Sequence, residues 1–105
     1  MVKMVNGLIE LQQILENNRN IIIDFTASWC GPCQRIGPVF SELSEKYSNV
    51  VCIKVDVDNP DTKEMCSICE VRSMPTFVLV SSGEITQKLV GSDPKSLEQL
   101  FSRAT

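Results

Sequence analysis

The sequence predicts a single α/β domain over residues 1–105, with strands and helices in the order β-α-β-α-β-α-β-β-α. The length of 105 residues and the apolar fraction of 43% are typical of one globular domain. Apolar, β-branched runs alternate with segments of helical periodicity through most of the chain, which favours parallel strands covered by helices on both faces. Two strand-like runs near the C-terminus are separated by a short turn, which adds an antiparallel hairpin. The expected sheet is therefore mixed.

The N-terminal part of the chain predicts a strand, a helix and a second strand. Residues 2–5 form a short strand, and Asn6 can cap a helix that ends in the polar stretch before Ile21. The apolar side chains of this helix repeat at helical spacing and share one face: Leu8, Leu11, Ile14 and Leu15. The run 21–26 is apolar and β-branched, as in a strand buried on both faces, and Asp24 interrupts it.

The middle of the chain predicts a long helix, a third strand and a shorter helix. The long helix starts near Pro32, which suits a first turn, and we expect Pro38 to kink it. Its apolar stripe consists of Ile36, Val39, Phe40, Leu43 and Tyr47. Residues 50–57 form the third strand. Asn59 followed by proline predicts the start of the next helix, which ends near Glu70.

The C-terminal part predicts the hairpin and a closing helix. Residues 75–80 and 85–90 have strand character, and the polar stretch 81–84 between them suits a tight turn. Asp93 followed by proline starts the last helix. Its inward side chains are Leu97, Leu100 and Phe101.

Charge and composition exclude several classes of function. The net charge of −3 comes without a basic stripe, so nucleic acid is a poor partner for this chain. The longest aliphatic run, 21–23, is too short to span a membrane, and no apolar targeting segment follows the first residues. We therefore expect a cytoplasmic protein. The odd number of five cysteines favours thiol chemistry or metal binding over a framework of structural disulfides.

The segment Trp29-Cys30-Gly31-Pro32-Cys33 places two thiols where the second strand turns into the long helix. The free amides and the dipole of a helix N-terminus favour a thiolate there, so Cys30 is the expected nucleophile for disulfide exchange. Cys33 lies inside the first turn, where it is more covered, and is expected to resolve the mixed disulfide. Pro32 lacks an N–H that would otherwise stabilise the thiolate, which favours a reductant over an oxidant.

A second pair, Cys66 and Cys69, allows other interpretations of the cysteines. Four cysteines can hold zinc, but the long spacer after Cys33 contains a helix and a strand, which disfavours a zinc site. Because Cys66 and Cys69 share one helix face, they can form a second, regulatory disulfide or remain buried thiols. Cys52 is interpreted as a core residue.

Other candidate residues each have a functional and a structural interpretation. Burial should raise the pKa of Asp24 and make it a proton carrier for Cys33, although an Asp that accepts backbone hydrogen bonds is the alternative. Lys54 can pair with Asp24 or face solvent. Trp29 belongs to an apolar contact surface or to the core. Gly91 permits close approach of a partner backbone or is an ordinary turn residue.

Taken together, four segments resemble the thioredoxin family of the cytosolic type, nearly from end to end of the chain: Trp29-Cys30-Gly31-Pro32-Cys33, Asp24-Phe25, Lys54-Val55-Asp56-Val57-Asp58 and Met74-Pro75-Thr76. The resemblance implies the thioredoxin fold, a mixed five-stranded sheet sandwiched between four helices. It also implies a general protein-disulfide reductase that works through Cys30 and Cys33 and assigns proton transfer to Asp24. Pro75 would be a cis proline facing the dithiol, and the backbone of Met74 would pair with an extended substrate.

The resemblance further implies the partners of such a protein. No cofactor is bound, and electrons come from NADPH through flavin-containing thioredoxin reductase. The targets are disulfide-containing proteins such as peroxiredoxins and ribonucleotide reductase, and the protein is expected to be a monomer that maintains cytosolic redox balance. Gln34 departs from the family pattern, because a lysine often follows the second cysteine. The alternative function is that of a thioredoxin-fold adaptor or chaperone with incidental redox chemistry.

Overall fold

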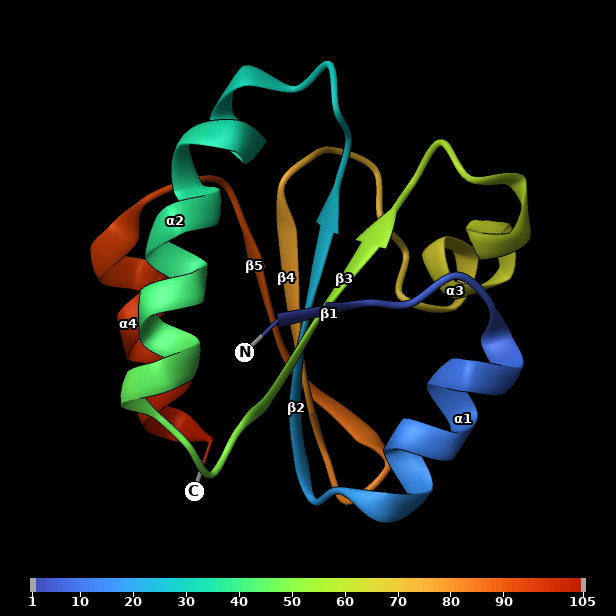
Figure 1. Ribbon diagram of the computed structural model, residues 1–105, viewed down its shortest axis with the longest axis horizontal. Coiled ribbons are helices and arrows are strands. Elements are labelled where there is room, and N and C mark those ends of the chain that lie inside the picture. The colour runs from blue at the N-terminus through green and yellow to red at the C-terminus, as the bar shows by residue number, and fades with distance from the viewer. Residues whose placement is uncertain (1, 105) are drawn as a thin grey trace.

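A computed structural model of the protein describes residues 2–104 and contains one mixed sheet between two layers of helices (Figure 1). The strands are β1 (Val2–Met4), β2 (Asn20–Thr26), β3 (Val51–Asp56), β4 (Thr76–Ser81) and β5 (Glu84–Val90). The helices are α1 (Leu8–Asn17), α2 (Gly31–Lys46), α3 (Lys63–Ile68) and α4 (Pro94–Arg103), and a 3₁₀ turn over Pro60–Thr62 precedes α3. The predicted element order is confirmed.

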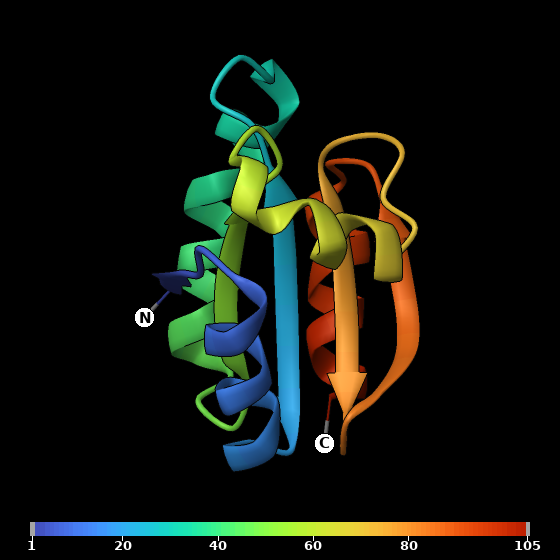
Figure 2. The same cartoon turned by 90° about the vertical axis from the view of Figure 1, so that its right-hand side faces the viewer.

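The strand order in the sheet is β1-β3-β2-β4-β5. The central strand β2 pairs in parallel with β3 and antiparallel with β4, which confirms the expected mixed sheet. Helices α2 and α4 cover one face, and α1 and α3 cover the other, as the side view in Figure 2 shows. Within the described residues 2–104, no helix combines the length and the apolarity needed to cross a bilayer.

The two faces of β2 fill two separate parts of the core, which explains why its apolar run does not alternate with polar residues. Ile22 packs with side chains of α2 and α4, whereas Ile21 and Ile23 pack with side chains of α1 and α3. Successive side chains of a strand point to opposite faces of the sheet. Asp24 therefore lies on the α2 side, two residues after Ile22.

Helices α2 and α4 both contribute to the core on their side of the sheet. The ring centroid of Phe40 lies 5.4 Å from that of Phe77 in β4 and 5.8 Å from that of Phe101 in α4. The inward side chains expected on α4 are all buried. Helix α2 continues past Pro38 to Lys46, so this proline does not end the helix.

The helix starts predicted from sequence are partly correct. Asn59 accepts a hydrogen bond from the N–H of Asp61, and Asp93 accepts one from the N–H of Ser96, so both caps are confirmed. The cap predicted at Asn6 is wrong, because Gly7 occupies the N-cap position of α1. No side-chain hydrogen bond caps α1 at Gly7, and the backbone N–H of Asn6, just before the cap, donates to the Glu10 carboxylate at 3.1 Å.

The remaining boundaries differ by a few residues for local reasons. Pro60 begins a 3₁₀ turn rather than an α-helix, and α3 ends at Ile68, before the predicted end near Glu70. Glu70 has a positive φ of 52°, a conformation that cannot continue a right-handed helix. The hairpin turn is tighter than predicted: it contains only Ser82 and Gly83, both with positive φ, as in a two-residue turn that matches the twist of its strands.

Candidate active site

The sequence-predicted dithiol lies at the carboxyl end of β2, in the connection to α2 (Figure 1). Cys30 and Cys33 are joined by a disulfide, and their Cα atoms are 5.2 Å apart. Cys30 is the N-cap residue of α2, and its Sγ accepts a hydrogen bond from the N–H of Cys33 at 3.2 Å. The helix N-terminus thus presents an amide to the sulfur that we expected to carry negative charge.

The expected difference in exposure between the two cysteines is wrong for this oxidised form. Cys30 is 5% exposed and Cys33 is 3% exposed, so both are buried. Ala27 packs against both cysteines, and Val57 and Met74 lie along the same cluster. The carbonyl oxygen of Met74 is 3.7 Å from the Cys30 sulfur. Cys30 is therefore covered by segments that are distant in the sequence, which a pattern along the chain cannot reveal.

Trp29 is 67% exposed, so the interpretation as a core tryptophan is wrong. Its indole N–H donates to the carboxylate of Asp58 at 2.7 Å. We did not expect a role for Asp58 from the sequence. The available signal was topological: Trp29 follows β2 and Asp58 follows β3, and the carboxyl ends of neighbouring parallel strands meet at one edge of the sheet.

Asp24 is buried in β2, with an exposed fraction of 1%. Burial raises its pKa to about 7, and the positive charge of Lys54 opposes that shift. Lys54 is the register partner of Asp24 on β3, and its Nζ lies 3.8 Å from the position that a Cβ atom on Gly37 would take. Among the described residues, Asp24 Oδ1 has no hydrogen-bond partner, which contradicts the alternative of a backbone-bonded carboxylate for this oxygen.

Met74, Pro75 and Gly91 lie together beside the disulfide. The Met74–Pro75 peptide bond is cis, as the resemblance implies. The N–H of Gly91 donates to the carbonyl oxygen of Pro75 at 3.0 Å, which ties the end of β5 to the loop before β4. Gly91 has a φ of 117°, which favours glycine at this position. The structure therefore brings three distant sequence segments to one surface: residues 29–33, 74–75 and 91.

The other cysteines carry free thiols. Cys52 is buried in β3, and burial raises its pKa to about 12, as expected for a core residue. Burial also raises the pKa of Cys66 and of Cys69. This second pair lies at the C-terminal end of α3, where the helix dipole disfavours a thiolate, in contrast to the position of Cys30.

The described part of the chain contains no group of side chains that could form a metal site. Within residues 2–104, no three His, Cys, Asp or Glu side chains are grouped as metal ligands.

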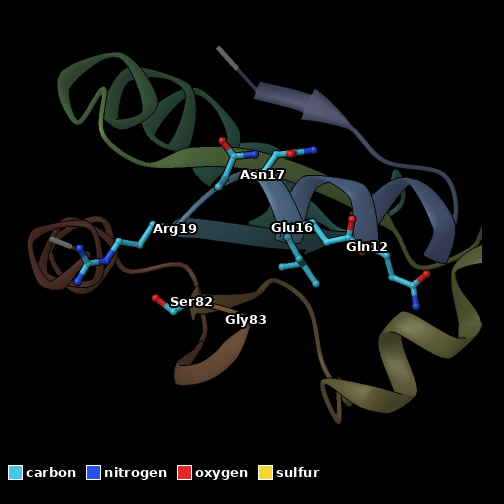
Figure 3. A pocket seen from close by; sticks show the side chains of 8 residues that line it. Gln12, Glu16, Asn17, Arg19, Ser82 and Gly83 are labelled. Atoms are coloured by element: carbon cyan, nitrogen blue, oxygen red, sulfur yellow. The ribbon is translucent and has the colours of Figure 1, made fainter.

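A shallow hollow of about 820 Å³ lies at the opposite end of β2 from the disulfide, between the end of α1 and the β4–β5 turn. Figure 3 shows Gln12, Glu16, Arg19 and Ser82 among the residues around it. No cysteine lines this hollow.

Comparison with known proteins agrees with the resemblance noted in the sequence. The model of the thioredoxin family matches residues 8–103. A thioredoxin from Coprinus comatus is 40% identical over 106 residues, covering 99% of this chain and 98% of the relative.

Solved structures agree with the sequence comparison. The structure of Plasmodium falciparum thioredoxin has a TM-score of 0.92 and 38% identity, covering 98% of this chain and 99% of that one. A chain from a study of the thiol resolving mechanism of yeast mitochondrial 1-Cys peroxiredoxin via the glutathione and thioredoxin systems has a TM-score of 0.89. It is 33% identical, and the match covers 97% of this chain and 94% of that one.

Proposed function

Because this chain belongs to the thioredoxin family of protein-disulfide reductases, we propose that it carries electrons to disulfide-containing target proteins in the cytoplasm. Proteins of this family carry no bound cofactor, so the electrons must come from outside. The proposed source is NADPH, through a flavin-containing thioredoxin reductase. The observation that supports the proposal most is the Cys30–Cys33 pair at the N-terminus of α2.

The proposed reaction begins with attack by the Cys30 thiolate on one sulfur of the target disulfide. A bond forms between Cys30 and that sulfur while the target S–S bond breaks, and the leaving thiolate takes a proton. Cys33 then loses its proton and attacks the Cys30 sulfur. The Cys30–Cys33 bond forms, and the second target thiolate leaves. Two electrons pass to the target, which is reduced, and the protein is oxidised.

Asp24 is the proposed proton acceptor for Cys33. A carboxyl group with a pKa of about 7 exists in both protonation states near neutral pH, which suits a group that must accept and return a proton. Lys54 acts on Asp24 by favouring its charged form. Gly31 and Pro32 form the first turn between the two cysteines.

The proposed target surface consists of Trp29, Met74, Pro75 and Gly91. Trp29 offers an exposed apolar face beside the disulfide. An extended target segment would pair with the backbone of Met74, whose carbonyl oxygen already lies near the Cys30 sulfur. Peroxiredoxins are one proposed target class, supported by the structurally similar chain from the peroxiredoxin study. Ribonucleotide reductase is another, and the protein is proposed to act as a monomer.

Reduction of insulin coupled to NADPH oxidation tests this function directly. With thioredoxin reductase present, we expect NADPH consumption and insulin precipitation that both depend on the protein. The alternative, an adaptor or chaperone, predicts that insulin or unfolded clients bind without any NADPH consumption. Heat-inactivated reductase serves as the control, since it removes the electron source and leaves binding intact. Client binding without turnover would contradict the proposed function.

Cys66 and Cys69 are proposed as a secondary redox pair. Hydrogen peroxide can take two electrons from the two thiols, which gives one S–S bond and two water molecules. Because burial raises the pKa of both thiols, we expect this bridge to form at least about tenfold more slowly than the Cys30–Cys33 bridge. Peptide mass spectrometry during a peroxide titration measures both rates, with Cys69→Ser as the control. Absence of the bridge at every peroxide concentration would contradict the proposal.

A further inference from the structure

Gln34 connects the turn that carries Cys30 to the first turn of α2. Its side-chain Nε2 donates a hydrogen bond to the carbonyl oxygen of Ala27 at 3.1 Å. Its backbone N–H donates to the carbonyl oxygen of Cys30 at 3.2 Å. One residue of the helix thus contacts both ends of the turn 27–30.

The carbonyl oxygen of Ala27 fixes the turn 27–30 through hydrogen bonds. It accepts a second hydrogen bond from the backbone N–H of Cys30 at 3.2 Å, so both of its lone pairs are used. Ala27 is fully buried and packs against Cys30 and Cys33. A movement of this carbonyl would therefore move the backbone that carries the Cys30 sulfur.

We propose that Gln34 is a positioning residue that keeps the Cys30 sulfur at the N-cap of α2 when the Cys30–Cys33 bond is open. In the oxidised form, the covalent bond itself keeps the sulfur near the N–H of Cys33. Reduction removes that bond, and the hydrogen bonds to Ala27 then hold the turn in place. Because it rests on the proposed role of Cys30 as nucleophile, the effect should appear in the reactivity of that thiolate.

Charged residues of the site come from α2, β2, β3 and the segment after β3, and Gln34→Met leaves all of them unchanged. Arg35 in α2 places its Nη1 3.4 Å from the position that a Cβ atom on Gly31 would take. Asp24 lies in β2, and Lys54 is its partner on β3. Asp58 lies after β3 and binds Trp29. The amide of Gln34 is uncharged, so its contribution is one of geometry rather than of charge.

Two substitutions separate geometry from charge. Gln34→Met keeps the length of the side chain and its neutrality but removes the N–H donor. Gln34→Lys keeps an N–H donor, on a longer side chain, and adds a positive charge. Gln99→Met, on an exposed position of α4, is the matched control. The measurement is the alkylation rate of Cys30 in the reduced protein from pH 5 to pH 10, resolved by peptide mass spectrometry, with melting of the oxidised form as the check on folding.

We expect Gln34→Met to lower the alkylation rate of Cys30 at pH 7 about fivefold, the equivalent of one net hydrogen bond of about 1 kcal/mol, and to move the pH midpoint upward. Gln34→Lys should react at least as fast as the unchanged protein, and Gln99→Met should match it. A decrease of less than twofold in Gln34→Met, or an equal loss in Gln34→Lys, would overturn the inference. If the fast-reacting thiol is a cysteine other than Cys30, the proposed function itself fails.

Discussion

Replacing Cys30 with serine is expected to lower the rate of insulin-disulfide reduction by roughly a thousandfold or more, because a serine hydroxyl is not ionised at neutral pH and cannot attack a disulfide. Cys33 is not expected to replace it, because Cys33 lies inside the first turn of α2, whereas Cys30 occupies the N-cap position beside the free amides of the helix. The measurement is the coupled assay with NADPH and thioredoxin reductase. Cys52→Ala is the matched control, because this buried thiol of β3 has no part in the proposed reaction.

The companion variant Cys33→Ser should stop the reaction one step later. Cys30 can still attack the target, but no second thiol releases the mixed disulfide, so covalent adducts on Cys30 accumulate. Non-reducing electrophoresis with peptide mass spectrometry detects these adducts and identifies the targets. If Cys33→Ser turns over normally, or if adducts form in Cys30→Ser at the same rate, the assignment of nucleophile and resolving thiol is wrong.

Asp24 should make the protein less stable as the pH rises from 4 to 7. The pKa of Asp24 is about 7 in the folded state, against a value of 3.8 for an unperturbed Asp. Below pH 3.8 the carboxyl is protonated in both the folded and the unfolded state, so its ionisation does not lower the free energy of unfolding. Above that pH the unfolded state ionises first, so the free energy of unfolding decreases until the folded state ionises as well, and it levels off above about pH 7.

The pKa difference of about three pH units corresponds to about 4 kcal/mol at 1.36 kcal/mol per unit. Asp24→Asn removes this titration, so the stability of the variant relative to the unchanged protein should rise by about that amount between pH 4 and pH 8. Urea unfolding at a series of pH values measures it. Comparison across pH cancels the constant cost of placing an amide in the buried site.

Asp24→Asn also tests the proposed proton transfer, because an amide cannot accept the proton of Cys33. The release of a preformed mixed disulfide on Cys30 should become slower at pH 7, while the attack of Cys30 on the target should stay nearly unchanged. Stopped-flow measurement of Trp29 fluorescence can separate the two steps. A variant whose stability difference is independent of pH would show that Asp24 ionises as freely in the folded state as in the unfolded chain.

Patterns along the chain were sufficient to predict the elements and the reactive pair. The burial of β2 on both faces follows from its continuous apolar run, and the stripe on α2 follows from helical periodicity. Asn59 and Asp93 cap the 3₁₀ turn and α4 because each places a side-chain acceptor directly before a proline. The dithiol could be located because a strand and a helical stripe flank it. In each case, neighbours in the sequence determine the local conformation.

Contacts between distant segments were not predictable in this way. The bond from Trp29 to Asp58 and the cover that Met74 places over Cys30 depend on how separate loops meet at one end of the sheet. The hydrogen bond from Gln34 to Ala27 spans only seven residues, but it crosses the turn between β2 and α2, whose shape the sequence pattern does not give. Such outcomes depend on tertiary geometry, and a single sequence carries little information about it.

Helix α2 begins at the reactive pair, and its middle part is anchored in the core, where Phe40 packs against Phe101. Close-packed interiors transmit displacement rather than absorb it, so the reactive end of this helix has little freedom to change shape when a target arrives. The conformational change that binding requires must then occur in the target protein. We therefore expect disulfides in locally unfolding segments of a target to be reduced faster than disulfides inside rigid domains.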